Sequence, residues 1–177
     1  MNLKSTKYNY LFQQYKNDIY HYSLFMLGNR FDAEDAVQDV LIKTWENING
    51  FNILSAKAWM IKTTHNRCLD LLRKRKRSLN NEVPIDENFE GNFFNPNEID
   101  LNTMVNDKIN SEQIKLKINI LPDNLKSVFV LHEIQGFKYR EISKALDIPL
   151  NSVKVYLMRA RKKLQEELKS YELQEVI

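Results

Sequence analysis

The segment EISKALDIPLNSVKVYLMRARKKL, residues 141–164, has the pattern of a short helix, a tight turn and a longer, basic helix. At about 100° per residue, the apolar side chains of the second helix form one stripe, which predicts the face that packs against the core. That stripe holds Val153, Leu157, Ala160, Leu164 and Leu168. The opposite side places Val155 and Met158 beside the cations Arg159 and Lys162. Apolar groups among cations suit thymine methyl groups and the DNA backbone, so this side is predicted to face DNA.

This arrangement predicts a helix-turn-helix, a module whose second helix enters the major groove of DNA. The residues DIPL, 147–150, are expected to form the turn, and Asn151 or Ser152 is expected to cap the second helix. A preceding helix should begin after Pro122 and end at Gly136. The candidate DNA-binding residues of the second helix are Ser152, Lys154, Val155, Met158, Arg159 and Lys162. The alternative is an amphipathic helix with an ordinary basic surface, and the spacing of helix, turn and helix favours DNA binding over it.

The composition of the whole chain favours an all-α fold. Its 177 residues include only four Gly and four Pro, and Leu, Ile, Lys, Glu and Gln dominate many stretches. Residues 1–80 carry 13 Lys and Arg against 7 Asp and Glu, residues 81–112 carry 1 against 8, and residues 113–177 carry 12 against 8. The acidic part is rich in Asn, has two prolines and shows no sustained period, which is typical of a linker.

These patterns predict two small helical domains joined by a flexible linker. The expected boundaries are 1–78 for the first domain, 79–110 for the linker, 111–172 for the second domain with its helix-turn-helix, and 173–177 for a tail. No apolar run approaches the ~20 residues that span a bilayer, so no membrane insertion is expected. The single cysteine, Cys68, cannot form an internal disulfide, which fits the reducing cytoplasm as the expected location.

Metal binding and catalysis are not expected. His65 and Cys68 lie three residues apart, so a helix would place both on one face, but no further ligands follow at a recognisable spacing. The chain has no Gly-rich phosphate loop, no nucleophile motif and no catalytic carboxylate pair. We therefore predict no metal, no cofactor and no enzymatic activity.

The N-terminal part predicts a long amphipathic helix followed by an acidic one. Large apolar side chains recur at helical spacing in the first helix and are interpreted as core rather than as a base-stacking platform: Tyr8, Phe12, Tyr15, Ile19 and Tyr22. In FDAEDAVQDVLIKTWENINGF, residues 31–51, Asp32 is the expected N-cap and one face is apolar from Ala33 to Trp45. The other face carries Asp35, Gln38, Asp39 and Glu46. In a net-basic domain, this acidic face is either simply solvated or the docking site of a basic protein.

A third helix is predicted in AWMIKTTHNRCLDLLRKRKR, residues 58–77, which ends in five consecutive cations, Arg73 to Arg77. A basic run of this kind suits the backbone of a nucleic acid. Bases that leave a duplex need stacking surfaces and polar side chains that reach their pairing edges. The candidates for such a pocket are Phe51, Trp59, Asn66 and Arg67.

Taken in order, these segments resemble an extracytoplasmic-function (ECF) sigma factor, the minimal two-domain class of bacterial RNA polymerase specificity subunit. DAEDAVQDVLIKTW, residues 32–45, resembles the polymerase-binding helix of the first sigma domain. Residues 58–77 resemble the helices that melt and read the −10 promoter element. LPDNLKSVFVLHEIQGFKYREISKALDIPLNSVKVYLMRARKKL, residues 121–164, resembles the domain that reads the −35 element. The resemblance covers nearly the whole chain.

The resemblance implies a role for each candidate site. Docking on the clamp helices of the largest polymerase subunit is implied for Asp35, Gln38 and Asp39. Contact with the −10 element is implied for Asn66 and Phe51, near a flipped-out base, and for the basic residues Arg73, Lys74, Arg75 and Arg77. Contact with the −35 element is implied for Lys154, Val155, Met158 and Arg159. The implied partners are core RNA polymerase, promoter DNA and an anti-sigma factor, which in this family is often membrane-anchored.

Two alternatives place the chain in other classes. A helix-turn-helix regulator that binds duplex DNA without polymerase would leave the acidic face and the Asn66 helix without a role. A helical interaction protein whose ends only resemble DNA-binding modules would show no salt-dependent affinity for DNA. The chain also departs from the family pattern, because Asn151-Ser152 replaces a frequent Gly-Thr and Val155 replaces a small hydroxyl residue. Promoter sequence is therefore not transferable from relatives.

Overall fold

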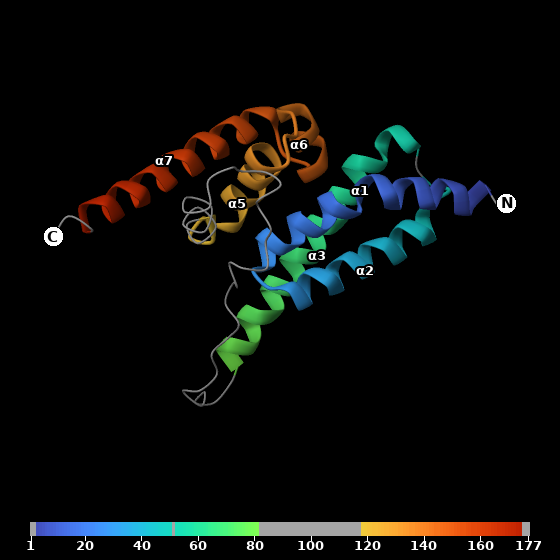
Figure 1. Cartoon of the computed structure of the whole chain (residues 1–177), viewed down its shortest axis with the longest axis horizontal. Coiled ribbons are helices and arrows are strands. Elements are labelled where there is room, and N and C mark those ends of the chain that lie inside the picture. Colours follow the sequence, from blue (N-terminus) through green and yellow to red (C-terminus); the bar gives the residue numbers. More distant parts are fainter. Residues whose placement is uncertain (1–2, 51, 82–117, 175–177) are drawn as a thin grey trace. The chain divides into compact units, whose positions relative to one another are not determined.

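The computed structural model is all-helical over the residues that it describes, 3–50, 52–81 and 118–174 (Figure 1). These helices belong to two compact units, so the expected all-α fold is confirmed. The first unit holds α1 (Leu3–Leu27), α2 (Arg30–Asn47) and α3 (Ile53–Asn81). The second unit holds α5 (Asp123–Phe129), the π-helical turn η3 (Val130–Ile134), α6 (Tyr139–Leu146) and α7 (Leu150–Gln174).

The predicted linker, residues 79–110, lies almost entirely outside the described residues, and so does Phe51. The helix α3 continues past the expected end of the first domain at residue 78 and ends at Asn81. The domain boundaries therefore stay predictions.

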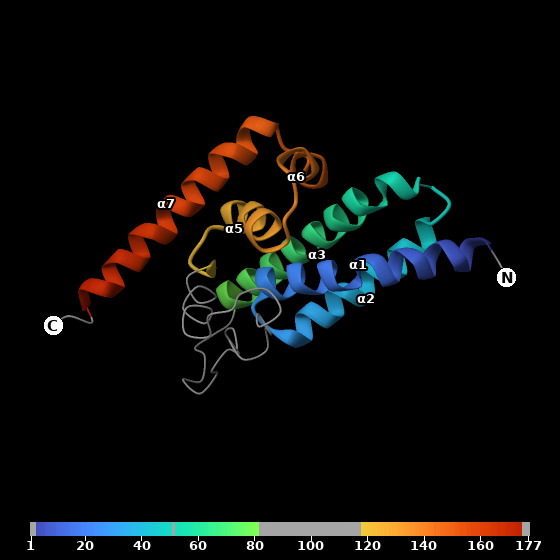
Figure 2. The ribbon, with the colours of Figure 1, turned by 45° about the horizontal axis from the view of Figure 1, so that its top comes forward.

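The first unit is built on α1, which packs against both α2 and α3, while α2 and α3 also pack against each other (Figure 2). The fully buried side chains of this core include Leu11, Ile19, Val40, Ile48, Ala56 and Met60. The interpretation of the aromatic stripe as core is confirmed for four of its five residues, because Ile19 and Tyr22 are fully buried and Tyr8 and Tyr15 pack against the core as partly buried residues. The fifth, Phe12, is partly buried and stacks on Tyr8. This packing fixes the rotation of each helix about its axis and so decides which side chains face outward.

The start of α2 differs from the prediction. Gly28 follows α1 with a positive φ of 75°, and the helix cap is Asn29 rather than Asp32. The side-chain oxygen of Asn29 accepts a hydrogen bond from the backbone N–H of Asp32 at 2.8 Å. Asp32 instead lies in the first turn, where a carboxylate favours the positive end of the helix dipole. The predicted cap was wrong because Asn and Asp both suit an N-cap and stand only three residues apart.

Trp45 was expected on the buried face of α2, but its side chain is 40% exposed. Its ring meets Tyr8 edge-on at a centroid distance of 5.3 Å, and the Lys4 ammonium lies 4.5 Å from the ring centroid. Trp45 therefore packs on the first turns of α1 at the edge of the core through aromatic and cation–π contacts, while Thr44 and Ile48 beside it are fully buried.

The second unit begins with α5 directly after Pro122, as predicted. The helix then widens into η3, where the N–H of Gln135 donates to the carbonyl of Val130, five residues earlier. Gly136 follows with a positive φ of 69°, and Phe137 turns into the core, where it is 2% exposed. A glycine suits this position because a left-handed backbone strains residues that carry a Cβ.

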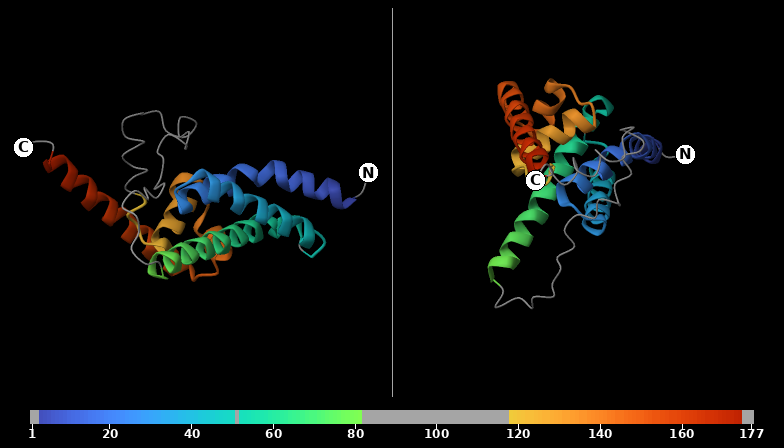
Figure 3. Two further views of the ribbon diagram at one scale, coloured as in Figure 1. Left: turned by 90° about the horizontal axis from the view of Figure 1, so that it is seen from below. Right: turned by 60° about the vertical axis from the view of Figure 1, so that its left-hand side comes forward.

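The predicted helix-turn-helix is formed by α6, a short turn and α7 (Figure 3). Asp147 ends α6 in the left-handed conformation, with a φ of 57°. The hydroxyl of Ser143 donates to the carbonyl of Ile148 at 2.7 Å, and the N–H of Ile148 donates to the carbonyl of Ser143 at 3.1 Å. These two bonds hold the turn against the end of α6.

The start of α7 corrects one prediction and confirms another. The helix begins at Leu150, so Asn151 and Ser152 lie inside its first turn and do not cap it. The carbonyl of Pro149 accepts a hydrogen bond from the N–H of Val153 at 3.2 Å. Pro149 therefore occupies the position directly before the helix, where Asn151 or Ser152 was expected. The predicted core stripe is buried at Val153, Leu157, Ala160 and Leu164, while the side chain of Leu168 lies outside the described residues.

Replacing the observed cap tests the start of α2. We expect Asn29→Ala to lower the free energy of unfolding of the first unit by about 1 kcal/mol, because the N–H of Asp32 loses its acceptor. Both tryptophans, Trp45 and Trp59, lie in this unit, so urea unfolding followed by tryptophan fluorescence reports on it alone. Asn29→Asp keeps an acceptor and should cost less. Wild-type stability in Asn29→Ala would contradict the cap.

Candidate functional site

One side of α7 carries the exposed side chains that were predicted to meet DNA. Val155 is 37% exposed and Met158 is 62% exposed, although both are apolar. The other predicted residues of this side, none of them buried, are Ser152, Lys154, Arg159 and Lys162. At the helical period all six fall within one half of the helix circumference, opposite the buried stripe. The structure therefore brings this predicted set together on one surface.

An ion pair fastens α7 to η3. The Nε and Nη2 atoms of Arg161 lie 2.8 Å and 2.6 Å from the same carboxylate oxygen of Glu133. This hydrogen bonding raises the pKa of Arg161 and keeps its guanidinium beside η3. The pair is largely exposed, so its contribution to stability is small, and its main effect is to orient the basic helix.

The acidic face of α2 points outward. Asp35 and Gln38 are exposed and Asp39 is partly exposed, whereas Ala36 and Val40 on the inner side are fully buried. Asp35 and Asp39 stand four residues apart, so their carboxylates lie on neighbouring turns of the same side, where like charges repel. The structure thus places the three predicted docking residues on a single surface.

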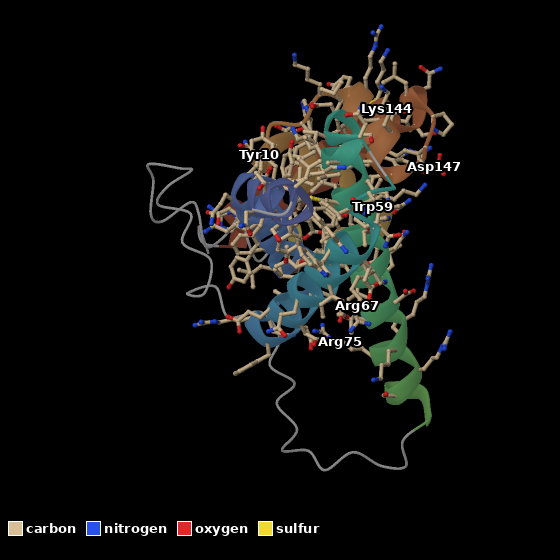
Figure 4. All side chains as sticks on the ribbon, turned by 90° about the vertical axis from the view of Figure 1, so that its right-hand side faces the viewer. Tyr10, Trp59, Arg67, Arg75, Lys144 and Asp147 are labelled. Carbon is tan, nitrogen blue, oxygen red and sulfur yellow. The ribbon has the colours of Figure 1, made fainter. Side chains whose placement is uncertain are left out.

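Arg67 of α3 reaches the two carboxylates of this face (Figure 4). Its Nη2 lies 3.0 Å from Asp35 Oδ2 and donates a hydrogen bond to it. Its Nε lies 2.6 Å from Asp39 Oδ2 but is enclosed and has no acceptor aligned with its N–H, so this second contact is ionic only. Arg67 was predicted to line a base pocket. Its engagement with α2 was missed, because no sequence period pairs residues on different helices.

The remaining pocket candidates lie along α3. Asn66 is exposed and Trp59 is partly exposed. They are seven residues apart, close to two helical turns, so both lie on one side of the helix. Phe51 lies outside the described residues, and the structure therefore places only part of the predicted pocket.

The basic end of α3 divides into outward and inward cations. Arg73, Lys74 and Arg77 are exposed, and Arg73 pairs with Asp70 at 3.0 Å on its own helix. Arg75 turns inward (Figure 4). Its guanidinium donates to the carbonyl of Leu27 at 2.8 Å and to the carboxylate of Asp32, which ties α3 to the turn between α1 and α2. Partial burial lowers the pKa of Arg75. Arg75 is thus already engaged within the unit.

His65 and Cys68, the two spaced residues of α3, do not form a metal site in the structure. The Nδ1 of His65 lies 2.8 Å from the hydroxyl of Tyr22. Cys68 is buried, and burial raises the pKa of its thiol to about 12, which disfavours the thiolate that a metal needs. Among the described residues, no group of three His, Cys, Asp or Glu side chains is close enough to hold a metal ion. None of the described helices combines the length and apolarity required to cross a bilayer.

Two family models match the chain, one in each unit. The model of Sigma-70 region 2 matches residues 11–78, and the model of Sigma-70 region 4 matches residues 111–164. The first match contains the acidic face of α2 and the exposed residues of α3. The second contains the helix-turn-helix.

Curated relatives and solved structures agree with these matches. The ECF RNA polymerase sigma factor SigW of Bacillus subtilis (strain 168) is 31% identical over 160 residues, which cover 88% of this chain and 85% of the relative. SigM of the same strain is 26% identical over 159 residues, which cover 88% of this chain and 91% of the relative. The sigma factor RpoE, solved in complex with the anti-sigma factor NepR from Bartonella quintana, matches with a TM-score of 0.67 at 24% identity. That match covers 89% of this chain and 94% of RpoE.

Two neighbouring arginines of α3 are expected to differ in their effect on stability. Arg75→Ala removes the bonds to Leu27 and Asp32 and should lower the free energy of unfolding of the first unit by about 1 kcal/mol, since the ion pair is about one-third exposed. Arg77→Ala removes an exposed cation and should change it by less than about 0.5 kcal/mol. Urea unfolding measures both. Equal stability of the two variants would show that Arg75 does not tie the helices together.

Proposed function

The chain belongs to the ECF sigma factors of the sigma-70 family, and from this membership we propose how its surfaces divide the work of promoter recognition. The resemblance predicted from the sequence is confirmed. The chain is an RNA polymerase sigma factor that directs promoter-specific transcription, and its partners are core RNA polymerase and promoter DNA. The roles of individual residues that follow are proposals.

The proposal for the −35 element rests on the exposed side of α7, and this observation carries the assignment. Leaving Val155 and Met158 exposed beside cations has no benefit for the fold, because burial would stabilise each by about 1.5–3 kcal/mol. In a major groove the same side chains can contact thymine methyl groups, and Arg159 can donate to guanine. Lys154 and Lys162 then neutralise phosphates.

The proposal for the −10 element rests on the outward side of α3. Asn66 offers an exposed amide, and Trp59, which packs against the core of the first unit, leaves part of its ring accessible on the same side of the helix. An amide and an aromatic edge suit a base that has left the duplex. Further along the helix, Arg73, Lys74 and Arg77 provide cations for the backbone of the opened strand. Arg75 is better explained as a structural residue, because its guanidinium is bonded within the first unit.

The proposal for polymerase docking rests on α2. Asp35, Gln38 and Asp39 form an outward acidic surface in a part of the chain that is otherwise net basic. Such a surface complements a basic protein surface and repels nucleic acid, so its better partner is a basic protein. We assign it to the positively charged clamp helices of the largest polymerase subunit.

Regulation and location complete the proposed function. The structurally similar RpoE was solved in complex with the anti-sigma factor NepR. We propose that an anti-sigma factor also controls this chain and that the chain acts in the cytoplasm. RNA synthesis would be catalysed by the polymerase, while this chain supplies recognition and strand opening.

In vitro transcription tests these assignments together. The purified chain is combined with bacterial core RNA polymerase and a pool of promoter DNA fragments, and the transcripts are sequenced. We expect initiation from a subset of fragments that share two spaced elements. A helix-turn-helix regulator acting without polymerase would bind duplex DNA but would give no sigma-dependent transcripts.

Positive charge introduced on α2 tests polymerase docking. Gln38→Arg and Asp39→Arg should each weaken capture of core polymerase by about tenfold or more, because a cation would face a basic partner. Gln38→Arg breaks no ion pair of the chain, and Gln14→Arg, on the exposed side of α1, adds the same charge elsewhere as a control. Capture is measured by pull-down with unfolding followed in parallel. Wild-type capture by both α2 variants would rule out this docking surface.

Paired substitutions on α7 test −35 reading. Arg159→Ala should weaken holoenzyme binding to a selected promoter by about 1–3 kcal/mol and reduce its preference over a promoter with a scrambled −35 element. Lys154→Ala should weaken binding to both promoters about equally and lower the slope of log affinity against log salt by about 0.9. Binding is measured by fluorescence anisotropy at several salt concentrations. Unchanged sequence preference in Arg159→Ala would remove Arg159 from the base-reading set.

A further inference from the structure

Arg67 is the residue at which two of the proposed surfaces meet. It directly follows Asn66 on α3, on the helix assigned to the −10 strand, yet its guanidinium is bound to Asp35 and Asp39 on the polymerase-docking face of α2. The side chain is only 28% exposed, whereas the carboxylates of Asp35 and Asp39 are 58% and 37% exposed. A basic partner can therefore approach the carboxylates from solvent while Arg67 holds them from the protein side.

The ion pairs of Arg67 with Asp35 and Asp39 are weak enough for another cation to replace the guanidinium. An ion pair whose carboxylates are this exposed contributes little to stability, because water screens it. The Nε of Arg67 lies near Asp39 without an aligned hydrogen bond, so this donor is not fully satisfied in the present arrangement. Asp35 and Asp39 would repel each other without a cation between them, and any basic partner that docks there can replace the one that Arg67 supplies.

The guanidinium of Arg67, once released from the carboxylates, can bind a phosphate group instead. The planar fork of Arg binds carboxylate and phosphate groups with the same paired geometry. Arg67 is flanked on α3 by the exposed Asn66 and, two turns later, by the exposed Lys74. A phosphate of a single strand lying along this side is thus the nearest alternative anion for the side chain.

We propose that Arg67 couples polymerase docking to capture of the −10 strand. In the free chain Asp35 and Asp39 hold its guanidinium. When the basic clamp of polymerase binds these carboxylates, Arg67 is released and binds a backbone phosphate of the opened strand beside Asn66. This inference rests on the proposed docking surface. It implies reciprocity, so that strand capture by Arg67 also strengthens docking.

The first experiment releases Arg67 from one of its carboxylates by substitution, in the absence of polymerase. Asp39→Asn frees one contact of Arg67, and Glu46→Gln removes the same charge from an exposed position of the same helix. Binding of the full chain to a fluorescein-labelled, mixed-sequence 12-nucleotide single strand is measured by anisotropy at several salt concentrations. We expect Asp39→Asn to bind about threefold more tightly than Glu46→Gln and to steepen the salt slope by about 0.7, the increment for one additional phosphate contact.

The double variant Asp39→Asn/Arg67→Gln decides the outcome. It should lose both the gain in affinity and the steeper slope, because the phosphate ligand is missing. The comparison with Glu46→Gln excludes a general effect of removing one negative charge from α2. Asp35→Asn provides a second release variant if Asp39→Asn unfolds. Equal affinities for Asp39→Asn and Glu46→Gln, or a gain that survives Arg67→Gln, would overturn the proposal.

A holoenzyme measurement separates this proposal from the docking assignment. Arg67→Gln should keep capture of core polymerase within about threefold of wild type but slow open-complex formation at a selected promoter, and Arg67→Lys, which restores the charge without the fork, should recover part of the rate. If Gln38→Arg and Asp39→Arg both leave polymerase capture intact, the docking surface is wrong, whatever Arg67 does. If docking holds and Arg67→Gln opens promoters at the wild-type rate, the coupling is wrong.

Discussion

Burial of one apolar stripe on each long helix is the constraint from which the functional surfaces follow. On α7, Val153, Leu157 and Ala160 are buried, and rotating the helix to bury Val155 and Met158 instead would expose this stripe. Each large apolar side chain that left the core would lose about 1.5–3 kcal/mol, so the rotation is strongly fixed. The basic and apolar side therefore faces outward mainly because of this burial, and the ion pair between Arg161 and Glu133 adds to the orientation of the helix. The same reasoning applies to α2, where Ala36 and Val40 are buried and the carboxylates lie opposite.

Features that repeat along one helix were predictable from the sequence. The all-α class, the helix-turn-helix and the core stripe of α7 all follow from the 3.6-residue period, and so does the acidic face of α2. Helix starts were less predictable, because several residues of similar capping strength compete for one position. Asn29 takes the place expected for Asp32, and Pro149 precedes the expected caps Asn151 and Ser152. Local chemistry alone does not rank such neighbours.

Contacts between helices were not predictable from the sequence. They decide which cations of α3 are paired within the chain and which remain exposed to a partner. The cations of α3 look equivalent in the sequence, but Arg67 and Arg75 are bound to carboxylates of α2, while Arg73, Lys74 and Arg77 face outward. The position of each cation around the helix decides whether it is paired or exposed, and that position depends on how α3 packs. Similarly, Trp45 is 40% exposed although Thr44 and Ile48 beside it are fully buried, so its ring lies at the edge of the core, which a local apolar pattern does not reveal.

The π-helical turn η3 sets the phase of the helices that follow it. A turn closed by a bond from Gln135 to Val130 holds one residue more than a regular α-helical turn, so later side chains are displaced around the axis. The short segment can in this way present Val128 to the core and still aim Glu133 at Arg161. A regular helix of the same length would deliver the chain to α6 at a different angle. The orientation of α7 is thus partly set by a single extra residue in the turn that precedes α6.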